Sequence, residues 1–244
     1  MGTIQPIDKA LEWAHREKVA FHTDAVQAVG KTPLSVKDTP VDLLSMSAHK
    51  FNGPKGIGAL YVRNGFRMNP LLRGGGQESG WRSGTENVPG IIGMGKAAEL
   101  AKKQLSNTNP NHHLSTIRDH FETLVLEHIT GSEINGDLDQ RLASFSHLSF
   151  ENCEAAGLVI LLDEYGVQCS AGSACMTGKQ EASHVQKAMG FSDEKAKSSL
   201  RFSFSQNHTK SDAEEAAMMV KNAVNKLHSV QSSDVGSVVV YTSS

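Results

Sequence analysis

The chain has 244 residues, of which 39% are hydrophobic and 20% are charged, and its formal net charge at pH 7 is −2. This composition is typical of a globular protein with one or two cores, and the lack of a basic surplus argues against a nucleic-acid-binding protein. No apolar run reaches the ~18 residues of a transmembrane helix, and no signal peptide is visible at the N-terminus. Three cysteines do not form a disulfide framework in a chain of this length. We therefore expect a reducing compartment, the cytoplasm first and an organelle matrix as the alternative.

The first part of the chain combines one helix with short apolar strands. Its apolar residues predict a helix near residues 7–14, followed by strands at 19–22, 41–44 and 58–62. Polar residues follow the carboxyl ends of the first two strands, which is the pattern of α/β proteins. Residues 73–87 contain five glycines and no periodicity, so they form either a functional loop or a solvated surface loop.

The second part of the chain is richer in helices. We expect helices at about 89–105, 114–129, 154–165 and 211–228, and strands at 143–150 and 199–204. The polar, Pro-containing segment 107–113 predicts a linker or a helix–helix turn. Gly166 suits the C′ position of a helix, and Ser211 with Glu214 predicts a capping box at the start of the last helix.

A lysine at position 50 carries the clearest chemical signal. Residues 47–58 read SAHKFNGPKGIG, so that Lys50 follows Ser-Ala-His and precedes a turn rich in Gly and Pro. A lysine amine can anchor an aldehyde cofactor as a Schiff base, and the neighbouring hydroxyl and imidazole can bind a phosphate. Glycines let the backbone approach a cofactor closely. Taken alone, a His-Lys pair indicates only a surface lysine, so the other motifs decide.

Two charged residues lie at or within predicted strands. Asp24 follows the first strand, where a carboxylate at the end of a buried strand needs a cation such as a protonated pyridine nitrogen. Cap preferences favour the alternative, in which Asp24 caps a following helix. Arg201 is flanked by apolar strand residues and either binds a carboxylate bidentately or forms a structural salt bridge.

Cys175 lies among small residues in the stretch 168–178, which reads QCSAGSACMTG. A thiol in such a loop can reach a substrate, whereas cysteines in helices and strands are usually inert. The Cys169/Cys175 pair suggests a disulfide or a metal site, but its spacing is not a zinc pattern and no second ligand pair follows. We predict no metal site, and we expect Cys153 in the core.

These motifs together resemble those of the cysteine desulfurases of the NifS/IscS type, within the class V aminotransferase family of enzymes that use pyridoxal 5'-phosphate (PLP). The resemblance runs from about Gly2 to about Lys226. Its segments are FHTDAVQAVGK, SAHKFNGPKGIGALYVR, GGGQESGWRSGTENVPGIIG and CSAGSACMTG. The implied fold is α/β, a PLP-dependent transferase of fold type I with part of the large domain (a mixed, mostly parallel sheet) and a C-terminal α+β small domain.

The resemblance assigns roles to individual residues. Lys50, Cys175 and His49 are implied to be catalytic, and Arg201 is implied to hold the substrate carboxylate. The implied cofactor-binding residues are Asp24 at the pyridinium nitrogen, Gln27 at the phenolic oxygen, Ser47 and His49 at the phosphate, Lys50 at the aldehyde, and Thr85 at the phosphate of the other subunit's cofactor. A homodimer is therefore implied.

The implied reaction converts L-cysteine to L-alanine and leaves a persulfide on Cys175. The sulfur then passes to an acceptor protein for iron–sulfur cluster assembly or thiolation, and neither nucleic acid nor membrane is an expected partner. Two alternatives stay open: an inactive fragment that acts as an interaction module, and a related PLP enzyme such as a selenocysteine lyase. Plain transamination is disfavoured because it needs no thiol.

Compared with the family, the sequence predicts an N-terminally truncated large domain. The family's upstream strands, a phosphate-binding helix N-terminus, a ring-stacking histidine and an asparagine near the cofactor would all precede Gly2, which leaves an exposed sheet edge. The expected domains are 1–106, the C-terminal part of the large domain, and 107–230, the small domain with the cysteine loop. Residues 231–244 are expected to be a flexible tail.

Overall fold

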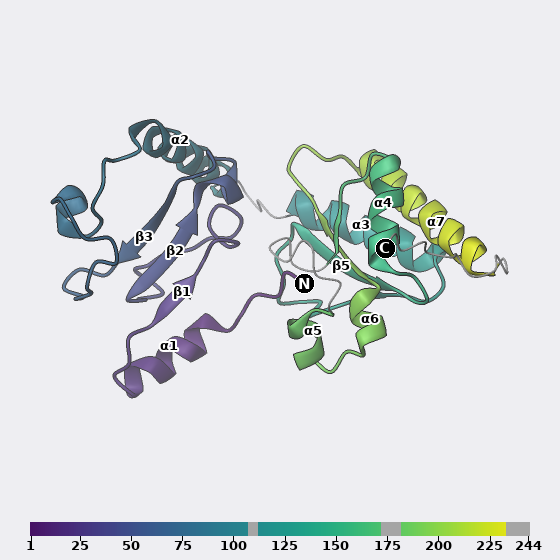
Figure 1. The fold of residues 1–244 in the computed structure, drawn as a ribbon, viewed down its shortest axis with the longest axis horizontal. Helices are drawn as coiled ribbons and strands as arrows, with labels where there is room; N and C mark the ends of the chain where they lie inside the picture. Colours follow the sequence, from purple (N-terminus) through teal and green to yellow (C-terminus); the bar gives the residue numbers. More distant parts are fainter. Residues whose placement is uncertain (107–111, 172–181, 233–244) are drawn as a thin grey trace, which may run out of the picture. The chain divides into compact units, whose positions relative to one another are not determined.

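The computed structural model of the chain describes residues 1–106, 112–171 and 182–232 (Figure 1). The chain divides into two compact units, one from Gln5 to Asn111 and one that combines Met1–Ile4 with the chain from His112 onward. The N-terminal unit contains α1 (Ile7–Arg16), β1 (His22–Asp24), β2 (Leu43–Ser47), η1 (Ala48–Phe51), β3 (Gly58–Val62), η2 (Gln77–Gly80) and α2 (Val88–Leu105). The C-terminal unit contains α3 (His112–His128), β4 (Ser132–Ile134), β5 (Phe145–Phe150), α4 (Ala155–Glu164), β6 (Ser170–Ala171), α5 (His184–Ala188), α6 (Asp193–Lys197), β7 (Ser199–Ser203) and α7 (Lys210–Ser232).

The N-terminal unit holds a mixed three-stranded sheet in the order β1-β2-β3. β1 runs parallel to β2, with Asp24 opposite Ser45. β3 is antiparallel to β2, with Gly58 opposite Ser47. Because β1 and β2 are parallel, their carboxyl ends meet at one edge of the sheet, which is where ligands bind in open α/β sheets.

Asp42 ties the three strands together at the opposite edge. Its side chain is buried, accepts the backbone N–H of Phe21 at 2.8 Å and pairs with the guanidinium of Arg63. Its own backbone N–H donates to the Phe21 carbonyl, and its carbonyl accepts the N–H of Arg63. Burial by itself would raise the pKa of Asp42, but the bond from Phe21 and the charge of Arg63 outweigh it and lower the pKa.

These contacts also explain why the first strand begins later than predicted. The apolar run at 19–22 predicts a strand there, but pairing starts at His22. The N–H of Val19 still donates to the carbonyl of Ala14 at the end of α1, and the N–H of Phe21 is taken by the Asp42 side chain. The apolar run at 19–22 therefore predicts a strand nearby without fixing the residue at which strand pairing begins, and Val19 itself is 50% exposed.

The C-terminal unit is built on a four-stranded antiparallel sheet in the order β4-β5-β7-β6. One face of this sheet packs against α3, α4 and α7, which lie together in Figure 1. Leu148 and Phe150 of β5 and Leu200 of β7 reach this core and are fully buried. Side chains alternate between faces along a strand, so His147 and Ser149 belong to the other face. The predicted α+β arrangement of this unit is therefore found.

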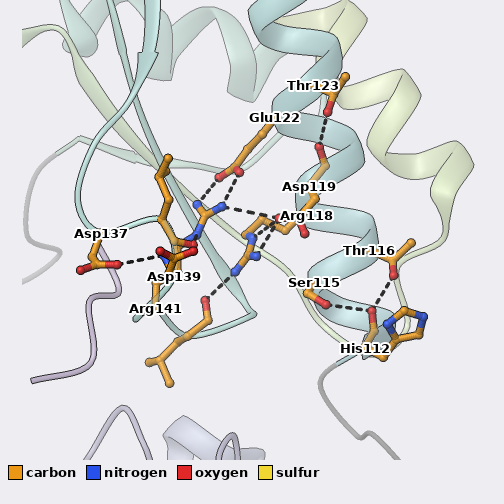
Figure 2. Close-up of polar contacts among 12 residues, drawn as sticks. His112, Ser115, Thr116, Arg118, Asp119, Glu122, Thr123, Asp137, Asp139 and Arg141 are labelled. Atoms are coloured by element: carbon orange, nitrogen blue, oxygen red, sulfur yellow. Dashed lines mark hydrogen bonds and ion pairs between the residues drawn. The ribbon is translucent and has the colours of Figure 1, made fainter.

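Buried ion pairs hold the segment after β4 on α3. The guanidinium of Arg141 binds the Glu122 carboxylate bidentately at 2.7 and 2.8 Å, and the two side chains are only 8% and 4% exposed. Figure 2 shows this pair beside Asp119, which also binds Arg118. Arg118 in turn donates to the carbonyl of Leu142 at 3.2 Å. The ion pairs thus give the three buried charged groups, Arg118, Glu122 and Arg141, a charged partner, which for Arg118 is the more exposed Asp119.

The same segment holds the first residues of the chain. Ile4 donates its N–H to the carbonyl of Gln140 at 2.8 Å, and Leu142 donates to the carbonyl of Gly2 at 2.9 Å. Thr3 forms an isolated antiparallel bridge with Arg141. These contacts explain why Met1–Ile4 belong to the C-terminal unit, which the sequence does not indicate.

The helix ends follow local sequence, with one exception. Gly166 after α4 has φ of 82°, as a C′ glycine does. The capping box of α7, however, is formed by Thr209 and Asp212 and not by Ser211 and Glu214. The N–H of Thr209 donates to the Asp212 carboxylate at 2.7 Å, and the N–H of Asp212 donates to Thr209 Oγ1 at 3.2 Å. The predicted pair, Ser211 and Glu214, has the same spacing two residues later. Spacing alone therefore does not identify which pair forms the capping box.

None of the helices in the described part of the chain is long and apolar enough to cross a lipid bilayer.

Replacing Glu122 with Ala is expected to lower the free energy of unfolding of the C-terminal unit by about 3 kcal/mol, because it leaves the buried Arg141 guanidinium without its bidentate partner. Urea denaturation followed by far-ultraviolet circular dichroism measures this change. The matched control is Lys187→Ala, which removes an ion pair with Asp193 whose side chains are 53% and 60% exposed, and which should cost less than about 1 kcal/mol. Equal effects of the two substitutions would contradict a stabilising role for the buried pair.

Replacing Asp42 with Asn is expected to destabilise the N-terminal unit in a pH-dependent way. A carboxyl whose pKa is lowered by folding stabilises the protein above its unfolded pKa of about 3.9 and loses this contribution as pH falls through the folded pKa. The difference in unfolding free energy between the original chain and the variant should thus be present at pH 7 and shrink below about pH 4. Tryptophan fluorescence in urea reports it, since Trp13 and Trp81 both lie in this unit.

The exposed Asp38 provides the matched control for this experiment. Asp38→Asn should change stability little at either pH, because the carboxylate it removes is solvated. A stability difference for Asp42→Asn that stays constant from pH 7 to the acid end of the titration would rule out the ionised carboxylate as its source.

Candidate functional site

Lys50 lies in a short helical turn that is anchored on both sides. η1 follows β2 directly, and its residues Ala48 and Phe51 are buried against Ala97 of α2. The N–H of Ala48 donates to the carbonyl of Ile57 at 3.1 Å, which closes the Gly- and Pro-rich turn onto the start of η1. His49 and Lys50 are thus carried on a turn whose backbone is held by its apolar neighbours.

Hydroxyl and imidazole groups gather at the carboxyl end of β2. Ser47 Oγ lies 2.8 Å from Nδ1 of His49. On the neighbouring strand, Nε2 of His22 lies 2.6 Å from Oγ of Ser45. His49 is exposed and Ser47 is half-buried, so both groups are accessible to a ligand at this edge of the sheet.

Asp24 lies at the carboxyl end of β1, beside Ser45 in the register of the sheet. Its Oδ1 accepts the N–H of Val26 at 2.9 Å. The residues that follow, 26–31, form turns and not the helix that the capping alternative requires. Asp24 therefore caps a turn through one carboxylate oxygen, on the same edge of the sheet as Ser47.

Gln27 lies in the turns after β1 and is oriented by Lys31. Nζ of Lys31 donates to Oε1 of Gln27 at 2.7 Å. Because a lysine ammonium can only donate, this bond assigns the oxygen end of the amide to Lys31. The NH₂ end of Gln27 is then the end that can donate elsewhere.

The loop that carries Thr85 is ordered by its own hydrogen bonds. Ser83 Oγ donates to the carbonyl of Gly75 at 2.7 Å, and Oε1 of Gln77 accepts the N–H of Gly84 at 3.1 Å. The Arg82 guanidinium donates to the carbonyl of Thr85 at 3.3 Å. Thr85 is exposed, so its hydroxyl is presented to the surroundings by a loop with a defined backbone.

Arg201 lies in the middle of β7, in the C-terminal unit, opposite His147 of β5 and Ser170 of β6. Its guanidinium carbon lies 5.8 Å from the centroid of the Phe145 ring, at cation–π distance. Its Nε is buried and has no hydrogen-bond partner among the residues that the structure describes. A structural salt bridge, the alternative for this residue, is likewise not found in the described chain.

A buried histidine accompanies Arg201. Nδ1 of His147 lies 3.1 Å from Nδ2 of Asn135, and the imidazole is 5% exposed. Burial lowers the pKa of His147 to about 3, helped by the positive charges of the N-terminal amino group and Arg201. Sequence reasoning missed both residues, because only the register of β4, β5 and β7 brings them beside Arg201.

The two described cysteines have thiols whose pKa is raised by their surroundings. Cys153 is buried, as predicted, with Sγ 3.3 Å from Nε2 of His228, and burial raises its pKa to about 11. Burial, together with the charge of Asp163, also raises the pKa of Cys169 to about 11. Cys175 lies outside the described residues.

Comparison with known proteins identifies the family. The family model for aminotransferase class-V matches residues 1–215, so the chain belongs to this family. The chain is 44% identical to a cysteine desulfurase of Gluconacetobacter diazotrophicus over 226 residues, which are 93% of this chain and 56% of that protein. It is also 44% identical to the cysteine desulfurase IscS of Methanosarcina thermophila over 230 residues, 94% of this chain and 56% of the relative.

Solved structures agree with this placement. A NifS-like protein matches with a TM-score of 0.80 at 35% identity, over 93% of this chain and 58% of that one. The NifS-like protein of Rickettsia africae matches with a TM-score of 0.82 at 29% identity, over 92% of this chain and 59% of that one. The resemblance and the fold class expected from the motifs are therefore confirmed. The chain spans just over half the length of the relatives that it matches.

Proposed function

We propose that this chain is part of a PLP-dependent cysteine desulfurase and carries that enzyme's lysine anchor and its sulfur-accepting thiol. The observation that supports it most is the arrangement at the carboxyl ends of β1 and β2. There Lys50 follows a hydroxyl–imidazole pair on an anchored turn, and Asp24 lies on the adjacent parallel strand. The family of the chain and the names of its relatives support the same function.

The side chains at this edge fit the chemical groups of PLP. The Lys50 amine is the partner for an aldehyde, and Ser47 with His49 offers a hydroxyl and an imidazole to a phosphate. Asp24 offers a carboxylate to a protonated pyridine nitrogen. The amide of Gln27 has its oxygen on Lys31, so its NH₂ end is the one directed to a phenolic oxygen.

PLP, when bound, supplies an electron sink for the bonds at the substrate Cα. In the proposed reaction Nζ of Lys50 accepts the Cα proton of L-cysteine. The negative charge of the Asp24 carboxylate would favour the protonated, positively charged form of the pyridine nitrogen. Arg201 holds the substrate carboxylate, for which its buried and unpartnered Nε is suited in the described chain.

Sulfur transfer is assigned to Cys175. Its thiolate attacks the substrate sulfur, an S–S bond forms, and the C–S bond breaks with its electron pair going to Cβ. A proton adds to Cβ, and the proton that Lys50 took returns to Cα, which gives L-alanine. The product on the protein is a Cys175 persulfide. The high pKa values of Cys153 and Cys169 leave both of them protonated at neutral pH, which makes them poor substitutes in this step.

The proposed assembly is a homodimer in which Thr85 reaches the cofactor phosphate of the other subunit. Its support is the exposed position of Thr85 on a loop whose backbone is ordered by Ser83, Gln77 and Arg82. The persulfide sulfur would pass to an acceptor protein of iron–sulfur cluster assembly or thiolation. A sulfur-carrying thiol needs a reducing compartment, and we assign the cytoplasm.

Lys50→Ala is expected to abolish covalent capture of PLP by the 244-residue chain, because it removes the amine that bonds the aldehyde. The measurement is incubation with PLP, reduction with borohydride and peptide mass spectrometry. Lys55→Ala is the matched control, since Lys55 is an exposed lysine in the same turn, and it should leave the adduct intact. An adduct that persists in Lys50→Ala and maps to another lysine would overturn the proposed anchor.

Cys175→Ser is expected to keep the PLP adduct and to lose sulfide release from L-cysteine in the presence of a thiol reductant. A serine hydroxyl cannot accept sulfur, so turnover should fall by at least about 100-fold. Cys169→Ala should retain both adduct and turnover. Sulfide release by Cys175→Ser at the rate of the unsubstituted chain would refute the assignment, and its absence from the unsubstituted chain would refute desulfurase activity of this chain.

A further inference from the structure

One row of side chains crosses the whole sheet of the C-terminal unit on the face opposite its core. β4 and β5 are in register through Ile134 and Leu148, and the next residue, Asn135, donates its N–H to the carbonyl of His147 at 2.7 Å. His147 lies opposite Arg201, and Arg201 lies opposite Ser170. We name Asn135, His147, Arg201 and Ser170 the polar row. Directly opposite residues in a sheet have Cβ atoms only about 5 Å apart, so each member borders the next.

The contact with Asn135 assigns one tautomer to His147. Nδ2 of an asparagine is a donor, so Nδ1 of His147 must accept and the ring proton is on Nε2. Asn135 is itself held by neighbours on the same face, because its Oδ1 accepts from Ser149 and its Nδ2 also reaches Ser199, both at 3.4 Å. In this arrangement the imidazole is held in one orientation, and its lowered pKa favours the neutral form.

Arg201 lies beside two planar rings, and its Nε–H has no acceptor in the described chain. The Phe145 ring lies at cation–π distance from its guanidinium, and the His147 imidazole lies opposite it in the sheet. Its Nε has no partner in the described chain although it is buried. A guanidinium that has to meet a carboxylate in bidentate geometry loses less entropy when its orientation is already fixed.

We propose that His147 is a positioning residue for Arg201: its imidazole, locked by Asn135, fixes the direction in which the guanidinium meets the substrate carboxylate. This inference rests on the proposed role of Arg201 in substrate binding. A protonated histidine in the same place would repel the guanidinium and compete for the carboxylate. The charged and titratable groups that face His147 are Arg201 and the N-terminal amino group, and both disfavour its protonation.

The test compares two substitutions in the full 244-residue chain. His147→Leu keeps the volume and removes the acceptor for Asn135, whereas His147→Asn places an amide oxygen near the position of Nδ1. A packing role predicts that Leu substitutes better than Asn, and the positioning role predicts the reverse. The exposed His128 supplies the control His128→Leu, which should change nothing.

The first readout needs neither cofactor nor turnover. In ¹⁵N NMR spectra the unsubstituted chain should show His147 as the Nε2–H tautomer, without titration between pH 5 and 8. The Nε–H signal of Arg201 should be sharp in the unsubstituted chain and in His147→Asn, and broadened or lost in His147→Leu. An Nδ1–H tautomer, a titration in this range, or an Arg201 signal indifferent to His147→Leu would overturn the proposal, even if a variant failed to fold.

The second readout is the turnover of L-cysteine by the PLP-loaded chain. His147→Leu should raise KM about tenfold with kcat changed less than about twofold, because it weakens binding of a group remote from the reacting bonds. His147→Asn should recover most of this loss. An equal fall in kcat for both variants would overturn the positioning role. If neither the variants nor the unsubstituted chain turned over L-cysteine, the proposed function of the chain would fail. The NMR result would still decide the role of His147.

Discussion

A single buried carboxylate sets the geometry on which the N-terminal unit depends. Asp42 receives the backbone N–H of Phe21 and the guanidinium of Arg63, and so joins β1, β2 and β3 where β2 begins. A shift of one residue in the pairing of β1 with β2 would turn every side chain to the other face. The register that Asp42 helps to hold therefore decides that Asp24 lies beside Ser45, at the same edge as Ser47 and the turn of Lys50.

In the C-terminal unit, too, hydrogen bonds hold polar side chains that the fold buries. The face of its sheet that packs against the helices is mostly apolar, whereas the other face buries several polar side chains, which are costly unless they are hydrogen-bonded. Asn135, His147, Ser149 and Ser199 satisfy one another there. Arg201 stands in their middle with an atom that nothing in the described chain satisfies. Among the charged side chains of the described residues, this guanidinium holds the buried atom without a partner, while the other such atoms belong to the neutral side chains of Ser144, Ser146 and Gln186.

The sequence predicted what is local and missed what depends on distant pairing. The position of Lys50 after Ser47 and His49, the α/β character and the buried state of Cys153 follow from neighbouring residues. The roles of Asp42 and His147 do not, because their partners lie 21 and 12 residues away and meet them only in the folded sheet. The capping box of α7 shows that sequence pattern can also fail to identify the interacting pair among residues close in the chain. Two candidate pairs had the right spacing, and only the backbone distinguishes Thr209 with Asp212 from Ser211 with Glu214.

The raised pKa values of the buried Cys153 and the half-buried Cys169 have a consequence for chemical labelling of the protein. With pKa values of about 11, only about one in a thousand of these thiols is ionised at pH 8. Haloacetamides and maleimides react with the thiolate, so both cysteines should be labelled far more slowly than an ordinary accessible thiol. A brief exposure to such a reagent then distinguishes any thiol of normal acidity in this chain from Cys153 and Cys169, without removing either by mutation.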